Sequence, residues 1–212
     1  MSGLLSSCMS NGKARRAVAS RRMHEDVAVE STRRRLSGKR ADTVRRLSRA
    51  TVEVLREVGY HELTLQAVAA QAGVARATAY TYFSSKDHLI AEVYWRRLAT
   101  EQPPESTSAD VKTRVIAVLR RLAFLVADEP ALADALRVVI NSSDPDVELL
   151  RAEIAKRTHE LISAAVADDA DEETVALLEL VYTGAMVRAG TGLASSADVT
   201  DQLEAAVRRM LR

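Results

Sequence analysis

The residue types that perform enzymatic chemistry or bind metals are few in this sequence and are not spaced for either purpose. The chain of 212 residues has one cysteine, Cys8, and four histidines. A single cysteine rules out an internal disulfide and any cysteine-based zinc site. His159 and Glu160 are adjacent but belong to no His-Glu-x-x-His motif, and no glycine-rich phosphate loop occurs. We therefore expect no catalytic site, no metal and no cofactor. A helical enzyme stays an alternative, and only this lack of clustered catalytic residues speaks against it.

Residues 64–89 carry the pattern that could recognise a ligand, and the ligand that fits it is DNA. Two short helices are predicted there, over 64–72 and 75–82. Thr64 is a good N-cap for the first helix, and Gly73 can adopt the positive φ that a tight turn requires. Two helices joined in this way form a helix-turn-helix, whose second helix presents a polar face to the major groove. The alternative is an ordinary helical hairpin with a glycine turn.

The elements that must position this segment are helices throughout the chain. There are only 8 glycines and 4 prolines, and the many Ala, Leu, Arg and Glu residues favour helices over strands. A helix is predicted over 41–58, ended by Gly59 as its C′ residue, and another over 86–99. Beyond Pro103 and Pro104, further helices are predicted over 111–127, 131–140, 147–165, 172–189 and 198–211. The predicted fold class is all-α.

Residues 64–89 resemble the DNA-binding signature of TetR-type transcriptional regulators. Three elements carry the resemblance: the Ala72-Gly73-Val74 turn, the Tyr80-Thr81-Tyr82-Phe83 end of the second helix, and Ser85-Lys86-Asp87-His88-Leu89 at the start of the next. The resemblance extends over about residues 41–97. Ala79 departs from the pattern, because family members often have leucine there. The smaller side chain should loosen the packing slightly without changing the fold.

The resemblance implies an N-terminal three-helix DNA-binding module and a C-terminal helical domain that binds an effector and dimerises. It implies a homodimer with one operator half-site per subunit. Most members repress transcription and release double-stranded operator DNA when a small molecule binds. An activator or a ligand-independent regulator of the same fold is the alternative within regulation.

Specific side chains receive roles from the resemblance, position by position. It implies that Gln66, Arg76 and Thr78 face base edges, and that Thr64, Tyr80, Tyr82 and Lys86 contact phosphates. The chemistry agrees, since arginine suits the guanine edge, whereas hydroxyls and an ammonium group suit phosphate oxygens. The alternative for the two tyrosines is packing against the first helix.

The second half of the chain contains candidates for an effector pocket. Apolar side chains and one histidine could line it: Phe124, Leu136, Val139, His159, Ile162, Tyr182 and Met186. The alternative is that the apolar residues are simple core and that His159 is a surface or core histidine. Aromatic residues are only 4% of the chain, which fits an aliphatic or lipid-like effector slightly better than a cation held by aromatic rings.

The helix predicted over 172–189 is apolar on two faces, which is more than one core can cover. We expect one of these faces and the final helix to form a homodimer interface. The predicted interface residues are Leu177, Leu180, Gly184, Val187, Leu203, Val207 and Met210.

Charge divides the chain into three parts. Residues 1–40 have ten Lys and Arg against three Asp and Glu, whereas residues 101–212 have twelve against twenty. We predict a basic, disordered arm over 1–40, a DNA-binding domain over 41–86, and an effector-binding and dimerisation domain over 87–212. The arm could add affinity for DNA, be a solvated tail, or belong to a module that binds acidic partners or membranes. Neither a run of 18 apolar residues nor a signal peptide is found, so the expected compartment is the cytoplasm.

Overall fold

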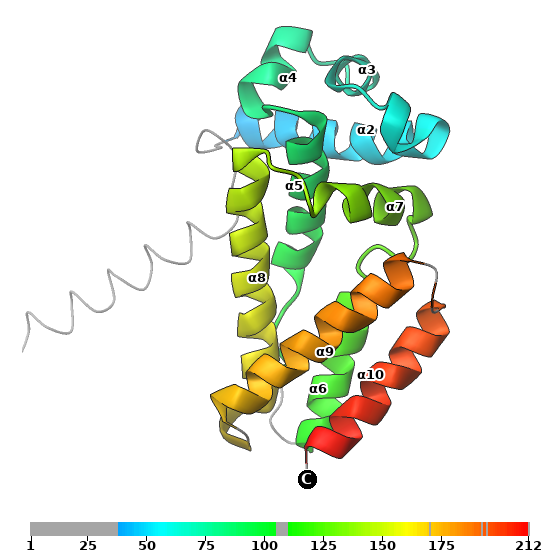
Figure 1. Cartoon of the computed structure of the whole chain (residues 1–212). Coiled ribbons are helices and arrows are strands. Elements are labelled where there is room, and N and C mark those ends of the chain that lie inside the picture. The colour runs from blue at the N-terminus through cyan, green and yellow to red at the C-terminus, as the bar shows by residue number, and fades with distance from the viewer. Residues whose placement is uncertain (1–37, 105–109, 170, 192, 194, 212) are drawn as a thin grey trace, which may run out of the picture.

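A computed structural model describes residues 38–104, 110–169, 171–191, 193 and 195–211 of the chain. The arm predicted over 1–40 therefore lies outside the described residues, apart from residues 38–40. Within the described ranges there are nine α-helices, one short 3-10 helix and no strands, which confirms the predicted all-α fold (Figure 1). The helices are α2 (Lys39–Glu62), α3 (Leu65–Gln71), α4 (Arg76–Tyr82), α5 (Lys86–Thr100), α6 (Val111–Phe124), α7 (Pro130–Val139), α8 (Pro145–Val166), the 3-10 helix η1 (Ala167–Asp169), α9 (Glu172–Gly190) and α10 (Ser196–Met210).

Helix boundaries follow the local signals in the sequence. Side-chain oxygens of six N-cap residues accept hydrogen bonds from backbone N–H groups in the first turn of their helices. These caps are Thr64 for α3, Ser85 for α5, Asp110 for α6, Asp144 for α8, Asp171 for α9 and Ser195 for α10. Gly59 has a φ of 71°, as expected for a residue that ends a helix, although a further turn continues α2 to Glu62.

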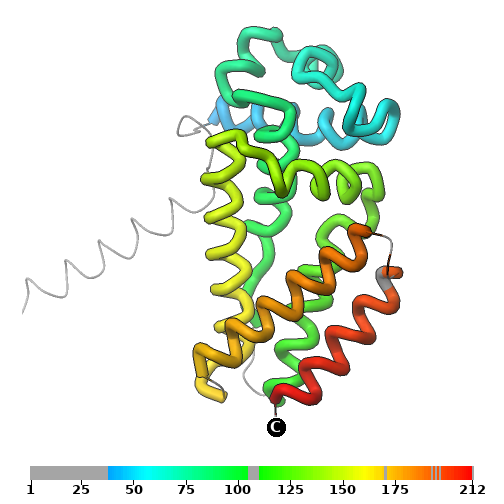
Figure 2. The backbone as a smooth tube through the Cα atoms, viewed as in Figure 1, coloured from blue at the N-terminus to red at the C-terminus, as the bar shows by residue number. Residues whose placement is uncertain are grey.

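Helices α2, α3 and α4 form a small module at one end of the molecule (Figure 1). Helix α5 leads from this module into the body, where it packs against α7 and α8 while also contacting α2. Helix α10 packs against α6 and α9 at the opposite end, as the backbone trace also shows (Figure 2). The apolar core is continuous across the module and the body, and Leu47, Leu89 and Leu150 in it are 0% exposed. The module is therefore fixed on the body both by α5, through burial and chain connection, and by the packing of α2 against α7.

The described ranges contain no helix long and apolar enough to cross a membrane. Those ranges also lack a cluster of three or more His, Cys, Asp or Glu residues that could hold a metal ion.

Candidate nucleic-acid interface

Helices α3 and α4 form a helix-turn-helix whose turn is held by backbone hydrogen bonds. Gly73 has a φ of 61°, which residues with a side chain rarely adopt. The Val74 N–H donates to the Ala69 carbonyl at 2.9 Å, which returns the chain toward α3. Ala69 is 1% exposed and Ala79 is 0% exposed, so small side chains let the two helices approach closely. The turn predicted from the sequence is confirmed.

Arg46 of α2 clamps this turn, and the sequence patterns did not reveal it. Its Nη2 atom donates to the carbonyl of Ala72 at 2.6 Å and to that of Gly73 at 2.9 Å. These carbonyls lie at the end of α3, where intrahelical donors run out. A Cβ atom on Gly73 would lie 3.0 Å from this nitrogen, so a residue with a side chain at position 73 would crowd the guanidinium. In the sequence Arg46 is one of several arginines on the polar side of its helix, and its spacing distinguishes it from none of them.

The outer face of α4 and the start of α3 carry the residues predicted to read bases. Gln66 and Arg76 are exposed, and Thr78 is half-buried. The Arg76 guanidinium carbon lies 5.5 Å from the centre of the Tyr80 ring, one helical turn away. Such a stacked guanidinium keeps its hydrogen-bond donors available at the edge. Arg76 is thus held at the surface, and its donors make no hydrogen bond or ion pair with the residues that the structure describes.

The residues predicted to contact phosphates fall into two groups. Thr64 is exposed and its hydroxyl accepts a hydrogen bond from the Ala67 N–H at 3.1 Å, whereas Tyr80 is 44% exposed. Tyr82 is 8% exposed and packs in the core, which favours a packing role for this tyrosine over a phosphate contact. The Lys86 ammonium donates to the carbonyls of Tyr60 and His61 at 2.9 and 3.1 Å.

Lys86 therefore has a structural partner at the end of α2. Its Nζ also lies 4.4 Å from the centre of the Tyr60 ring. The Tyr60 hydroxyl donates to Asp87 at 2.8 Å. Burial, together with this hydrogen bond and the charge of Asp87, raises the pKa of Tyr60 to about 12. Tyr60 consequently stays protonated and acts as a donor between α2 and α5.

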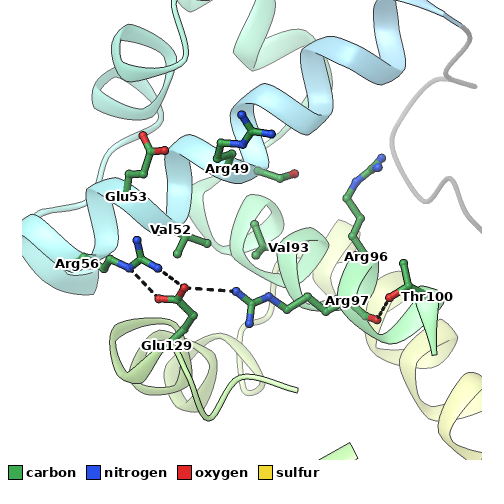
Figure 3. A pocket seen from close by; sticks show the side chains of 10 residues that line it. Arg49, Val52, Glu53, Arg56, Val93, Arg96, Arg97, Thr100 and Glu129 are labelled. Atoms are coloured by element: carbon green, nitrogen blue, oxygen red, sulfur yellow. Dashed lines mark hydrogen bonds and ion pairs between the residues drawn. The ribbon is translucent and has the colours of Figure 1, made fainter. Parts of the chain in front are cut away.

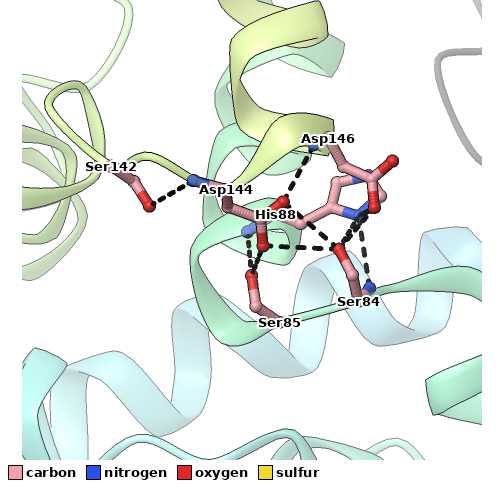
Figure 4. A network of polar contacts seen from close by, with 6 residues as sticks. All are labelled: Ser84, Ser85, His88, Ser142, Asp144 and Asp146. Atoms are coloured by element: carbon pink, nitrogen blue, oxygen red, sulfur yellow. Dashed lines mark hydrogen bonds and ion pairs between the residues drawn. The ribbon is translucent and has the colours of Figure 1, made fainter.

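A polar network connects the α4–α5 turn to the start of α8 (Figure 4). The Ser85 hydroxyl donates to Asp144 at 2.5 Å, and the Ser84 hydroxyl donates to Asp146 at 2.5 Å. The Nδ1 atom of His88 lies 3.1 Å from the Ser84 hydroxyl. Partial burial alone would raise the pKa of Asp144. The hydrogen bonds from Ser85 and from the Asp146 N–H, with the charge of His88, lower it overall. These contacts join the end of the reading module to the body.

Comparison with known proteins places this geometry in a family. Residues 47–93 match the family of bacterial regulatory proteins named tetR. An uncharacterised HTH-type transcriptional regulator of Mycobacterium tuberculosis is 40% identical over 163 residues, which cover 76% of each chain. The chain belongs to the TetR family.

Two further matches extend over most of the chain. The HTH-type transcriptional repressor KstR of Rhodococcus jostii is 25% identical over 176 residues, covering 79% of this chain and 82% of the repressor. A TetR transcriptional regulator from Rhodococcus sp. RHA1 has the same fold, with a TM-score of 0.65 and 22% identity over 82% of this chain and 98% of the other. This TetR-family protein is a DNA-binding transcriptional regulator and not an enzyme. Regulators of the family bind operator DNA and act as dimers.

The residues predicted to line an effector pocket differ in how deeply they are buried. Val139, Ile162 and Tyr182 are buried, whereas Phe124 is 42% exposed. Leu136 and Met186 are partly buried against the core. His159 is half-buried, and its ring nitrogens lie 2.8 Å from Glu179 and 3.3 Å from the Ser163 hydroxyl. An open groove elsewhere in the TetR-family fold, between α2 and α5, is lined by none of these residues.

The residues predicted to form the dimer interface divide between the surface and the core of one chain. Leu177, Leu180 and Val187 of α9 are 47%, 68% and 60% exposed, and Gly184 lies on the same exposed face. Val175, Leu178 and Tyr182 on the opposite face are buried. The expectation that α9 has two apolar faces, only one of them covered by the chain's own core, is therefore confirmed.

Helix α10 contributes differently from α9. Leu203 and Val207 are 1% and 0% exposed because they pack toward α6 and α9 within the chain, and Met210 is partly buried. Their burial in the core means that they can support an interface but do not present an open surface for it.

Proposed function

We propose that this TetR-family protein is a repressor that binds a palindromic operator as a homodimer, with one α4 helix in each of two successive major grooves. The observation that carries this proposal is the exposed face of α4 next to the turn clamped by Arg46, on which Arg76 stands beside Tyr80 and makes no hydrogen bond or ion pair with any described residue. A recognition helix needs both properties, because a mobile reading head pays ordering entropy on binding. Repression is supported by the relative KstR, which is a transcriptional repressor. Its site of action would be the chromosome, in the cytoplasm.

Side-chain roles in this proposal follow exposure. Arg76, Gln66 and Thr78 read base edges, and Thr64 and Tyr80 contact phosphates on either side. Tyr82 and Lys86 act mainly by holding the module, since Tyr82 is buried and Lys86 already bonds two carbonyls.

The homodimer in this proposal forms through the exposed face of α9. A row of exposed leucine and valine side chains on one helix marks an interaction surface when the opposite face is already buried. Leu177, Leu180, Gly184 and Val187 supply that row. A two-fold axis through it would give each subunit one operator half-site.

Release by a small molecule would act through α5. This helix begins at the reading module and packs in the body against α7 and α8. Burial raises the pKa of Tyr94 of α5 and of Tyr182 of α9, and the two side chains are close enough to influence each other's titration. An effector that separates these helices would move the module only if it binds that rearranged state more tightly.

The test measures, by fluorescence anisotropy, the binding of the purified protein to DNA from upstream of its own gene. Random DNA serves as the competitor. The proposal predicts a protected site with two-fold symmetry and a clear preference for it over random DNA. Equal affinity for both DNAs would contradict it. A reporter fused to the same upstream DNA distinguishes repression from activation, because deletion of the regulator raises expression only in the first case.

A further inference from the structure

We propose that the groove between α2 and α5 is a binding site for a small organic carboxylate. The groove has a volume of about 430 Å³, which lies in the range of small-molecule sites, roughly 300–1,000 Å³. It lies between the reading module and the body and is lined by none of the residues predicted for the effector pocket. Its lining residues are Ser48, Arg49, Val52, Glu53, Arg56, Val93, Arg96, Arg97, Thr100 and Glu129.

Two helix faces form the walls. Arg49, Val52, Glu53 and Arg56 have the spacing of one face of α2, and Val93, Arg96, Arg97 and Thr100 have the same spacing on α5. Glu129, the N-cap residue of α7, closes one end. The site is thus made by the module and the body together.

The positive charge at the Glu129 end is already used. Arg56 forms an ion pair with Glu129 through two hydrogen bonds, and the Arg97 guanidinium lies 3.8 Å from the same carboxylate. Arg97 also donates to Asp128 at 3.1 Å. Figure 3 shows Arg56 and Arg97 directed toward Glu129. No ligand is needed to explain these two arginines.

The other end of the groove has donors without acceptors. Figure 3 shows Arg49 and Arg96 pointing away from Glu129. Among the described residues Arg49 has no hydrogen bond or ion pair. Arg96 uses Nε on Glu92 at 2.9 Å, but its Nη2 atom is buried and makes no hydrogen bond within the described chain. The Ser48 hydroxyl is also buried and makes no hydrogen bond within the described chain. Arg49 is exposed and is the donor that an anion in the groove would meet first. Buried donors without partners are costly, so small side-chain movements that bring the anion to Ser48 and Arg96 would stabilise it further.

The lining also indicates which anion fits. A guanidinium fork matches the planar oxygens of a carboxylate. Val52 and Val93 offer apolar surface to a short hydrocarbon portion. Two carboxylates, Glu53 and Glu129, line the same groove and would repel a dianionic phosphate more strongly than a monoanion. Glu53 is itself held by Gln71 of α3 at 2.8 Å, and it does not pair with Arg49. A monocarboxylate with a short alkyl chain satisfies all of these conditions.

The experiment uses the full-length protein without DNA and titrates hexanoate by calorimetry, with thermal unfolding as a second readout. Hexanol and inorganic phosphate serve as comparison ligands. We expect saturable binding and a higher Tm with hexanoate, and neither effect with hexanol or phosphate. Equal binding of hexanol would remove the role of the arginines, and preferential binding of phosphate would overturn the carboxylate class.

Variants locate the site. Arg49→Gln should weaken hexanoate binding by at least about tenfold, because a charge-assisted hydrogen bond is lost. Ser48→Ala should weaken it without lowering the Tm of the free protein, since its buried hydroxyl has no partner to lose. Arg45→Gln is the matched control on α2, with a side chain that is 63% exposed and paired with Asp42. Unchanged binding by Arg49→Gln, or an equal loss in Arg45→Gln, contradicts the proposal. Because no DNA is present, these outcomes do not depend on operator binding.

Discussion

Arg76 is the residue on which sequence choice most depends, because the neighbouring positions 75 and 77 are alanines with no reading chemistry. We predict that Arg76→Ala costs about 1–3 kcal/mol on operator DNA and relaxes the preference at one base pair. Arg120→Ala, an exposed arginine on α6, is the matched control and should leave affinity unchanged. Anisotropy titrations against operator and random DNA check this. Equal losses of Arg76→Ala on both DNAs would remove the base-reading role.

Arg46 is a second single residue with a large expected effect. It stabilises the turn between α3 and α4 and has no role in reading DNA bases. We predict that Arg46→Ala lowers the free energy of unfolding by roughly 1–3 kcal/mol, because two end-of-helix carbonyls lose a charged donor. Operator affinity should fall with it, since the turn sets the angle of α4. Chemical denaturation compared with Arg45→Ala provides the measurement. A variant as stable as the wild type would show that water replaces the guanidinium without cost.

Asp144 gives the interface between module and body a pH dependence. Its pKa is lowered in the folded chain, so the folded state binds fewer protons there than the unfolded state. Its stabilising effect is present above the unfolded pKa of about 3.9 and is lost as the pH falls through the folded pKa. Asp144→Asn retains an N-cap residue. As the pH falls below about 4, we predict that the free energy of unfolding of this variant decreases less than that of the wild type. Asp201→Asn, at an exposed position, should follow the wild type.

At the scale of elements, the exposed face of helix α9 is the proposed interface between subunits. We predict that Leu180→Glu gives folded monomers with weak operator binding, because a charge in the apolar row opposes its burial. Leu149→Glu on α8 is a matched control, since both leucines are 68% exposed. Sedimentation and circular dichroism of the two variants provide the test. A dimeric Leu180→Glu protein would show that the dimer interface lies on another surface.

Sequence patterns predict elements well here because most helix boundaries have a local cause. Thr64, Gly59 and Gly73 mark helix ends by capping and by positive φ, and these signals depend on a few neighbouring residues only. The two faces of α9 were also predictable from periodicity. The direction of a long side chain depends on tertiary neighbours. For this reason Lys86 bonded to α2 and the Arg46 clamp could not be inferred from spacing.

At the scale of the whole molecule, α5 and the contact of α2 with α7 make the reading module and the body one unit. It carries Trp95, the single tryptophan of the chain, which is 2% exposed. A ligand that shifts α5 should therefore change the tryptophan fluorescence, and the change should track loss of operator binding. Ligand-induced release of DNA without any change in Trp95 emission would place the coupling outside this helix.

The central claim is that two chains read one symmetric operator through their α4 helices. Footprinting of the operator, combined with sedimentation of the complex, tests it most directly. We predict two chains per site and two protected half-sites whose centres lie about 34–36 Å apart, which is one duplex turn. A single chain bound to an asymmetric site, or protection without sequence preference, would contradict the claim.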